Sequence, residues 1–302
     1  MNISIIIPTY NRNKVLCNTI SNILSFKHQY NELIIVDQTK EHDYETRLFL
    51  QKLIKNANVK YLYSDTPNLP NARNIGIANA NGDAVLFFDD DVEINEDTIP
   101  SHISLLSEKN IGSVTGYVEN ANFGIDNNTY INNIKKIIKL IIFFFFKKKS
   151  AYVGSFGIIA NFSCKKIKLS DTCIGCNMSF KKDLLLKAGL FDINYTGNAY
   201  REETDMSIRL RRLGFKILYN PSASIIHYRT NSGGTRTDIV EKYWYNIFKN
   251  QCYFYVKNFN FSYLHILLIQ ILDILKCAKL KLNSINIFKN SYKDALYLAG
   301  SI

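Results

Sequence analysis

Three consecutive aspartates, Asp89, Asp90 and Asp91, directly follow the apolar run 84–88. Carboxylates this close repel one another unless a cation or hydrogen-bond donors neutralise them. Mg²⁺ and Mn²⁺ prefer carboxylate oxygens and often keep phosphate oxygens of a substrate among their ligands. The triplet therefore favours a site for a metal-bound diphosphate, and the alternative is a solvated turn whose aspartates cap the next helix.

Two further charged residues stand where binding sites often form. Asp37 ends another apolar run and could accept hydrogen bonds from a base or a ribose, although an aspartate at a strand end is also common in turns. Arg73 lies near an expected helix start and could pair with phosphate or with the acidic triplet. An ordinary surface arginine is the alternative there.

A second acidic cluster, formed by Glu202, Glu203 and Asp205, begins another expected helix. Acidic residues are favoured at a helix N-terminus by the helix dipole, so capping is one explanation. Transfer of a group to a hydroxyl needs a carboxylate base near the reacting centre, and Glu203 could supply it.

His227 ends a short β-branched run, and two glycines at 233–234 and Arg236 follow it. The histidine could be a metal ligand or a packed side chain. The glycines would let the backbone approach phosphate, to which Arg236 would add charge. Cys173 and Cys176 lack the two further ligands that a closed zinc site needs, so zinc is disfavoured.

The elements that must position these residues alternate along the first 91 residues. Strands are predicted over 3–7, 33–36, 59–63 and 84–88, and helices over 14–26 and 69–80. This alternation predicts a largely parallel sheet with helices on both faces, and ligands of such sheets gather at the carboxyl ends of the strands. Asp37 and the acidic triplet are both expected at those ends.

Beyond about residue 173 a second ordered stretch is predicted. A strand over 174–180 is followed by helices over 181–188 and 203–213, and then by two short strands over 215–219 and 223–227. Residues beyond 238 are expected to be helical.

The composition is that of a folded globular protein, with 302 residues of which 47% are hydrophobic. The net charge of +11 would suit nucleic acid, an anionic membrane surface or a phosphorylated substrate. Six cysteines are spread along the chain, and the N-terminus enters a strand-like run at once. A cytoplasmic protein is expected.

Two segments could contact a membrane, although no stretch has the roughly 18–20 uncharged apolar residues of a spanning helix. Residues 131–149 place lysines beside isoleucines and four phenylalanines, which fits a basic interfacial helix or a buried helix with charged ends. Residues 261–282 have a helical period and could pack on protein or lie on lipid.

The ordered motifs resemble those of glycosyltransferase family 2, which has the GT-A nucleotide-sugar-binding fold. The resemblance covers residues 1–236 apart from an expected insertion. It rests on residues 4–12 (SIIIPTYNR), 35–37 (IVD), 69–76 (LPNARNIG) leading to 88–91 (FDDD), 175–180 (GCNMSF) and 202–205 (EETD) followed by Arg209.

This resemblance implies a division into a nucleotide-sugar-binding half (1–118), an insertion (119–172), an acceptor and catalytic half (173–237) and a helical extension (238–302). Together with the motifs it implies donor contacts from Pro8, Thr9, Tyr10, Arg12, Asp37, Arg73, Asp89, Asp90 and Arg236. The expected metal ligands are Asp91, Asp89 and His227.

The resemblance further implies inverting transfer of a sugar from a nucleotide-sugar to a hydroxyl, with Mn²⁺ or Mg²⁺ as cofactor. Glu203 stands where the family usually has an aspartate base, and neighbouring Glu202 leaves that role open between the two. The expected acceptor is a saccharide or a lipid-linked saccharide, with peripheral contact to the cytoplasmic face of a membrane and a role in cell-surface polysaccharide or glycolipid synthesis.

A non-catalytic module that binds nucleotide-sugar or polysaccharide is the first alternative, and the intact acidic, basic and histidine positions argue against it. A nucleic-acid-binding protein is the second. No recognisable nucleic-acid motif supports it, so no nucleic-acid partner is expected.

Overall fold

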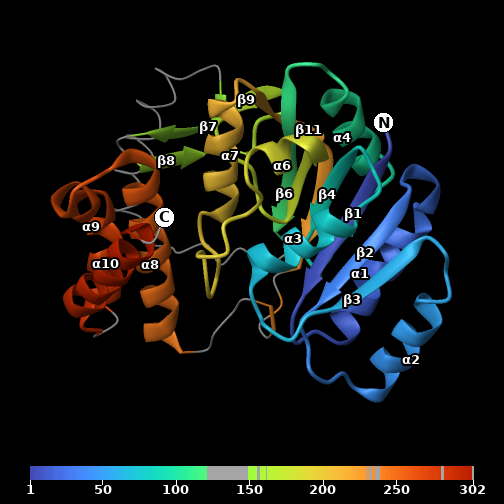
Figure 1. The fold of residues 1–302 in the computed structure, drawn as a ribbon, viewed down its shortest axis with the longest axis horizontal. Coiled ribbons are helices and arrows are strands. Elements are labelled where there is room, and N and C mark those ends of the chain that lie inside the picture. The colour runs from blue at the N-terminus through green and yellow to red at the C-terminus, as the bar shows by residue number, and fades with distance from the viewer. Residues whose placement is uncertain are drawn as a thin grey trace.

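A large mixed sheet with helices on both faces forms the body of the molecule, and three long helices pack at one end of it (Figure 1). The computed structural model describes residues 1–120, 149–154, 157–160, 162–228, 230, 233–234, 239–279 and 282–300. Residues 131–148 of the first suspected membrane segment lie outside this part of the chain.

The strands of the described residues are β1 (Ile3–Thr9), β2 (Glu32–Asp37), β3 (Val59–Tyr63), β4 (Ala84–Phe88), β5 (Val92–Ile94), β6 (Ile111–Asn120), β7 (Lys149–Gly154), β8 (Gly157–Ala160), β9 (Lys168–Ser170), β10 (Asn177–Lys181) and β11 (Lys216–His227). The helices are α1 (Lys14–Ser25), a short 3₁₀ turn (Lys27–Gln29), α2 (Tyr44–Leu53), α3 (Leu69–Asn79), α4 (Thr98–Leu106), α6 (Lys182–Lys187), α7 (Glu202–Arg212), α8 (Val240–Phe259), α9 (Tyr263–Lys279) and α10 (Ser284–Gly300).

The N-terminal half has the parallel arrangement expected from the alternation of strands and helices. Strands β3, β2, β1 and β4 are adjacent in that order and all run parallel. Along β1, Ile5 and Ile7 join a core shared with α1 and α4, whereas Ile6 joins a core shared with α3 and α7. A strand buried on both faces is a continuous apolar run, which is why the sequence of residues 3–7 predicts a strand.

The sheet as a whole is mixed rather than largely parallel. Strand β10 lies between β4 and β6 and is antiparallel to both, so the parallel arrangement stops after β4. The two short strands expected over 215–227 are one irregular strand, β11. Within the expected insertion 119–172, β9 pairs with β11 and thereby extends the same sheet.

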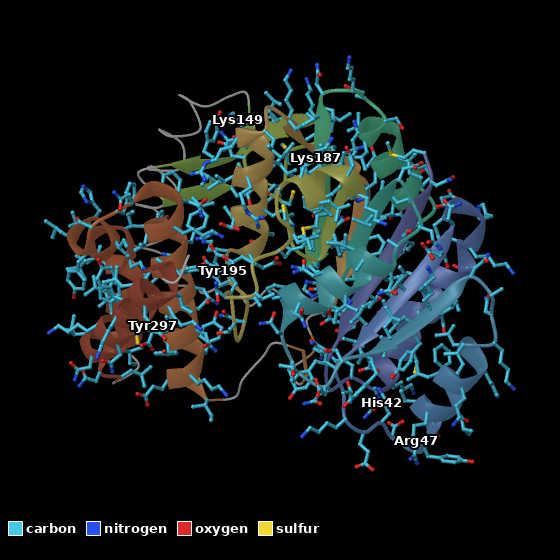
Figure 2. The ribbon with its side chains drawn as sticks, viewed as in Figure 1. His42, Arg47, Lys149, Lys187, Tyr195 and Tyr297 are labelled. Atoms are coloured by element: carbon cyan, nitrogen blue, oxygen red, sulfur yellow. The ribbon has the colours of Figure 1, made fainter. Side chains whose placement is uncertain are left out.

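The C-terminal helices α8, α9 and α10 form a third core that is rich in aromatic residues, and the expectation of a helical extension is confirmed. Tyr195 joins this core to the sheet body, and its ring centroid lies 5.1 Å from that of Tyr253 on α8 (Figure 2). No helix among the described residues is both long enough and apolar enough to cross a membrane.

A buried polar network fastens β10 to two other strands. The Asn177 amide on β10 donates to the carbonyl oxygens of Tyr117 and Ala223, at 3.1 and 2.8 Å, and its Oδ1 lies 2.8 Å from Nε2 of His102. The bond to Ala223 crosses the intervening strand β6 next to Gly116. Gly116 lies opposite the irregular part of β11. Burial lowers the pKa of His102 to about 4, so this histidine is neutral.

We expect Gly116→Ala to lower the free energy of unfolding by about 1–3 kcal/mol, because a Cβ there would overlap the Ala223 carbonyl and the Asn177 amide. Urea unfolding followed by circular dichroism measures the change. Gly300→Ala is the control, since its new Cβ would have no neighbour within 4 Å. Equal stability of the two variants would contradict this account of the network.

Candidate active site

The ends of three neighbouring strands bring the first set of expected residues together. Thr9 at the end of β1 is the register partner of Asp37 at the end of β2, and Ile6 of β1 is paired with Phe87 of β4. Asp89, two residues after Phe87, therefore emerges at the same edge of the sheet. The expectation that Asp37 and the acidic triplet share this edge is confirmed.

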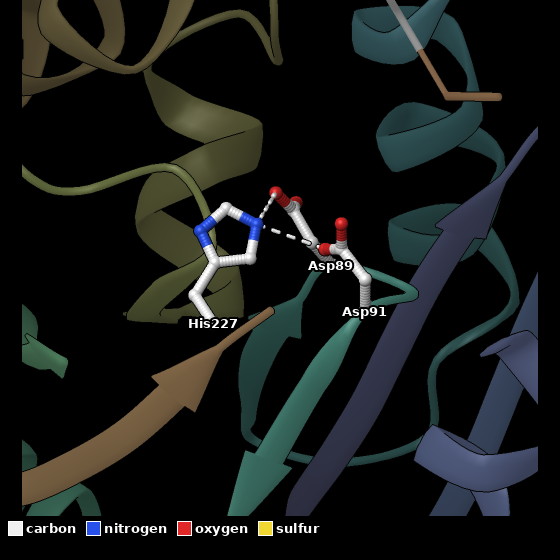
Figure 3. Close-up of side chains that lie close together, drawn as sticks. All are labelled: Asp89, Asp91 and His227. Atoms are coloured by element: carbon white, nitrogen blue, oxygen red, sulfur yellow. Dashed lines mark ion pairs between the residues drawn. The ribbon is translucent and has the colours of Figure 1, made fainter. Parts of the chain in front are cut away.

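His227 reaches this edge through the antiparallel pairing of β5 with β11. Val92, the first residue after the triplet, is the register partner of His227. The Nε2 atom of His227 consequently lies 2.8 Å from Oδ1 of Asp91 and 4.0 Å from Oδ2 of Asp89 (Figure 3). Among the described residues, only these three form a group of possible metal ligands, with one atom from each within 4.8 Å of the others.

Arg12 neutralises the inner side of the triplet. Its guanidinium Nε donates to Oδ1 of Asp90 at 3.1 Å, and Nη2 lies 3.3 Å from Oδ2 of Asp91. The Thr9 hydroxyl donates to the other oxygen of Asp90 at 2.7 Å. Burial raises the pKa of Asp90 to about 7, and Arg12 and Thr9 oppose that shift.

The loop after β11 closes over the same residues. The Gly234 amide donates to the Tyr10 carbonyl at 2.7 Å, and a Cβ on Gly233 would collide with the Asn11 carbonyl. Both glycines have positive φ angles, which favour residues without a Cβ. The Thr230 amide, which residue spacing alone did not single out, donates to Oδ2 of Asp91 at 3.3 Å. Arg236 lies outside the described residues.

A cavity of about 820 Å³ opens beside the triad and is lined by Glu202 and Glu203 of the second acidic cluster, whereas Asp205 is buried and paired with Arg209 and Lys257. Its wall includes Asp89 and His227 on one side and Glu203 at the start of α7 on another. Tyr200 and Arg201, which immediately precede α7, also line it and were not identified from the sequence. Ala199 and Arg201 have φ angles of +51° and +80°, a strained backbone of the kind often found at functional sites.

The two neighbouring glutamates of this cluster have different surroundings. Glu202 is buried and forms an ion pair with Nη1 of Arg73, whose Nη2 also donates to the Gly175 carbonyl at 3.1 Å. Glu203 is partly exposed to the cavity. Burial raises the pKa of Glu203, and Arg201 and Arg73 oppose the shift. A carboxylate with a raised pKa beside an open cavity has the properties of a general base.

Arg73 is a buried core residue rather than the surface arginine of the alternative interpretation. Its side chain is 2% exposed, and Nη2 lies 4.0 Å from Oδ1 of Asp89. The guanidinium carbon lies 5.7 and 5.5 Å from the ring centroids of Phe87 and Phe191. Arg73 therefore joins β4 to the start of α7.

Asp37 is fully buried, and its carboxylate already has protein partners. Oδ1 accepts from the Thr39 amide at 2.8 Å, and Oδ2 lies 2.6 Å from Nε2 of His42 and 2.9 Å from the Tyr61 hydroxyl.

Cys173 and Cys176 are buried as free thiols. In the part of the chain described, these cysteines take no part in a cluster of metal ligands.

The triad fits a divalent cation. Two carboxylates and an imidazole supply oxygen and nitrogen ligands that Mn²⁺ accepts, and Asp89, 34% exposed, is open to the cavity from which a phosphate oxygen could complete the shell. Burial raises the pKa of Asp89, and the neighbouring Asp91 charge adds to the shift, while His227 and Arg73 oppose it. A bound cation would remove the repulsion between the two carboxylates.

The family model for glycosyl transferase family 2 matches residues 4–183. The chain belongs to this family. The match contains β1, β4 and β10, and it extends to just beyond the start of α6. Glu203 and His227 of the candidate active site lie beyond its last residue.

This family-2 chain matches parts of longer curated relatives. An uncharacterized glycosyltransferase of Rickettsia conorii is 33% identical over 116 residues, which are 38% of this chain and 19% of the relative. Poly-beta-1,6-N-acetyl-D-glucosamine synthase of Staphylococcus aureus is 24% identical over 224 residues, which are 73% of this chain and 48% of the synthase. The chain thus spans about a fifth to a half of their length.

Solved structures show that this family-2 chain has the GT-A fold. TarS residues 1–349 of S. aureus with UDP-GlcNAc superposes with a TM-score of 0.60 and 15% identity, over 98% of this chain and 80% of TarS. The mannosyltransferase PcManGT of Pyrobaculum calidifontis with GDP-Man and Mn²⁺ gives 0.57 and 14%, over 99% and 75%. GalNAc-T7 with UDP, GalNAc and Mn²⁺ gives 0.59 and 15%, over 87% and 52%.

We expect Arg12→Gln to destabilise this family-2 chain by about 3–5 kcal/mol, because it leaves buried carboxylates without their cation. Denaturant unfolding in the presence of EDTA measures the effect without a contribution from metal. Arg47→Gln, on the exposed side of α2 (Figure 2), is the matched control and should change stability by less than about 0.5 kcal/mol. Similar stability of the two variants would exclude Arg12 as the main counter-charge of the triplet.

Proposed function

We propose that this chain transfers a sugar, with inversion, from a nucleoside-diphosphate-sugar to a hydroxyl of an acceptor. The observation that carries the proposal is one cavity whose wall contains both Asp89 and His227 of the triad and the carboxylate of Glu203. A single displacement needs two such groups, one that accepts the hydroxyl proton and one that stabilises the leaving diphosphate.

The residues proposed to hold the divalent metal are Asp89, Asp91 and His227. When bound, the cation would offset the negative charge that develops on the departing nucleoside diphosphate. Arg12 and Thr9 hold Asp90 away from the cation and keep the strand end in place. Asp90 is expected from the sequence to bind the donor. Under this proposal it instead stabilises the site through its bonds to Arg12 and Thr9.

For proton transfer we assign Glu203 as the base and Glu202 as a positioning residue. Glu202 is paired with Arg73 inside the protein, whereas Glu203 is partly exposed to the cavity. Arg73 forms an ion pair with Glu202 and lies 4.0 Å from Asp89, so it would hold the donor side and the acceptor side of the cavity in a fixed relative position.

The nucleotide is proposed to lie along the ends of β1 and β2, where Pro8, Thr9 and Asp37 are adjacent. Tyr10 would border it. Because Asp37 is fully buried and both of its carboxylate oxygens have protein partners, it would act by fixing this edge of the sheet. Since TarS was solved with UDP-GlcNAc, UDP-sugars are the first donors to test.

The acceptor is proposed to be a saccharide or lipid-linked saccharide in cell-surface polysaccharide or glycolipid synthesis, at the cytoplasmic face of a membrane. The partial match to a poly-N-acetylglucosamine synthase supports a glycan acceptor. A non-catalytic binding module remains the alternative function, and release of nucleoside diphosphate distinguishes the two.

Mn²⁺ should raise the melting temperature of the wild-type chain, and a nucleotide-sugar that it accepts should raise it further, since both bind only the folded state. Asp91→Asn and His227→Ala should lose most of the Mn²⁺-dependent rise, because each removes one ligand. Thermal shift with and without the metal measures this.

Asp83→Asn, an aspartate in the turn before β4 and outside the triad, is the control for the metal site. An unchanged Mn²⁺ response in both triad variants would exclude the triad as the metal site.

Glu203→Gln should lower sugar transfer by about 10²–10⁴-fold while donor binding, measured by calorimetry, stays within about twofold. Because burial raises the pKa of Glu203, the wild-type rate should fall as the pH drops through a value above that of an ordinary glutamate. The pH profile of kcat/KM measures this acidic limb.

Glu45→Gln, on the exposed first turn of α2, should leave both rate and profile unchanged. Full activity of Glu203→Gln would show that the base is another group.

A further inference from the structure

Helix α9 has two apolar faces, and among the described residues only one of them packs against protein. Its inner face buries Ile266, Ile274 and Cys277 in the C-terminal core. Its outer face exposes four large aliphatic residues: Leu264 (62%), Leu268 (59%), Ile271 (46%) and Leu275 (54%). These four residues are here called the α9 stripe. An amphipathic surface helix has a polar outer face, so the α9 stripe departs from that pattern.

The members of the α9 stripe follow one another at intervals of four, three and four residues. At 3.6 residues per turn this spacing places them in one row, about 16 Å long. A single exposed leucine is ordinary, whereas a continuous row of four marks a surface that binds something. The helix has 17 residues, fewer than the roughly 20 that span a bilayer, so contact with lipid would run along its side.

The charges along residues 260–290 decide which partner fits. This stretch has four lysines, at 276, 279, 281 and 289, and a single acidic residue, Asp273. Helical spacing places Asp273 about 180° from Leu264, on the opposite side from the stripe. A second copy packed in parallel would bring lysines towards lysines, and an antiparallel copy would offer them no acidic partner, because the only acidic residue of this stretch is on the side opposite the stripe. Anionic lipid headgroups offer both the apolar layer and the opposite charge.

We propose that the α9 stripe binds a membrane surface rich in anionic phospholipid, with α9 lying parallel to that surface, and that the positive charge of residues 260–290 favours the anionic headgroups. The proposed function includes contact with a membrane, and the α9 stripe is the surface that would make this contact. The proposal does not depend on the chemistry assigned to Glu203 or to the triad.

The opposite side of α9 approaches the active-site cavity. Asp273 is close enough to Tyr200 on the cavity wall for its charge to raise the pKa of that phenol, in addition to the larger effect of burial.

Sedimentation with vesicles tests the proposal, using the full chain without nucleotide or metal. Wild type should bind vesicles of 40% phosphatidylglycerol in phosphatidylcholine and bind pure phosphatidylcholine much more weakly, by roughly tenfold or more. Leu268→Gln combined with Ile271→Gln should lower binding to the anionic vesicles by roughly tenfold or more. Both residues are exposed, so the fold should be retained, which circular dichroism checks.

The matched control removes two exposed aliphatic residues from the other end of the molecule, by Leu48→Gln combined with Ile54→Gln at α2 (Figure 1). It should bind vesicles as wild type does. Lys276→Gln combined with Lys279→Gln should weaken binding to anionic vesicles and leave binding to neutral ones unchanged.

Three outcomes would overturn the proposal. These are equal binding of wild type to neutral and anionic vesicles, unchanged binding by the stripe variant, and a wild-type dimer in analytical ultracentrifugation that the stripe variant converts to monomer. The last outcome would assign the stripe to a second copy. Release of nucleoside diphosphate in solution is measured separately, so a failure of the docking proposal stays distinguishable from a failure of the proposed function.

Discussion

The repulsion among three adjacent carboxylates at the end of β4 is the constraint on which the site depends. The protein relieves it on two sides with residues far apart in sequence. Arg12 binds Asp90 and Asp91 from the loop after β1, and His227 contacts Asp91 from the end of β11. Asp89 lines the cavity, and its cationic partners among the described residues, Arg73 and His227, are both 4.0 Å away. The charge left over is therefore concentrated where a cation and a diphosphate could bind.

Bringing His227 to the triplet requires the mixed sheet. An all-parallel continuation after β4 would place the next strand end at the same edge but would offer no partner for β5. Strand β10 instead runs antiparallel between β4 and β6, and the last three residues of β11 pair with β6 along one edge and with β5 along the other. The irregular part of β11 leaves the Ala223 carbonyl to the Asn177 amide, which can reach it because Gly116 has no side chain. A small packing feature in the centre of the sheet thus supports the metal ligand at its edge.

The sequence predicted those parts whose cause is local. The strand over 84–88 has the bounds that were expected, because a buried strand is a continuous apolar run ended by polar turns. The strand over 59–63 also has the expected bounds, although it is an edge strand that is only partly buried. The positions of Asp37 and the triplet followed from the same rule. The antiparallel place of β10 did not, since an apolar run carries no sign of its direction. Thr230 and the wall formed by Tyr200 and Arg201 were also missed, because their contacts depend on how distant loops pack.

The difference between Glu202 and Glu203 also comes from long-range packing. Neighbouring residues on a helix point about 100° apart, so the two side chains have different surroundings although both residues line the cavity. The buried guanidinium of Arg73 on α3 needs a carboxylate, and Glu202, which is itself buried, forms the ion pair. Glu203 is partly exposed to the cavity and has a pKa raised by burial, which the charges of Arg201 and Arg73 oppose. The same packing that buries one charge leaves the adjacent one able to accept a proton.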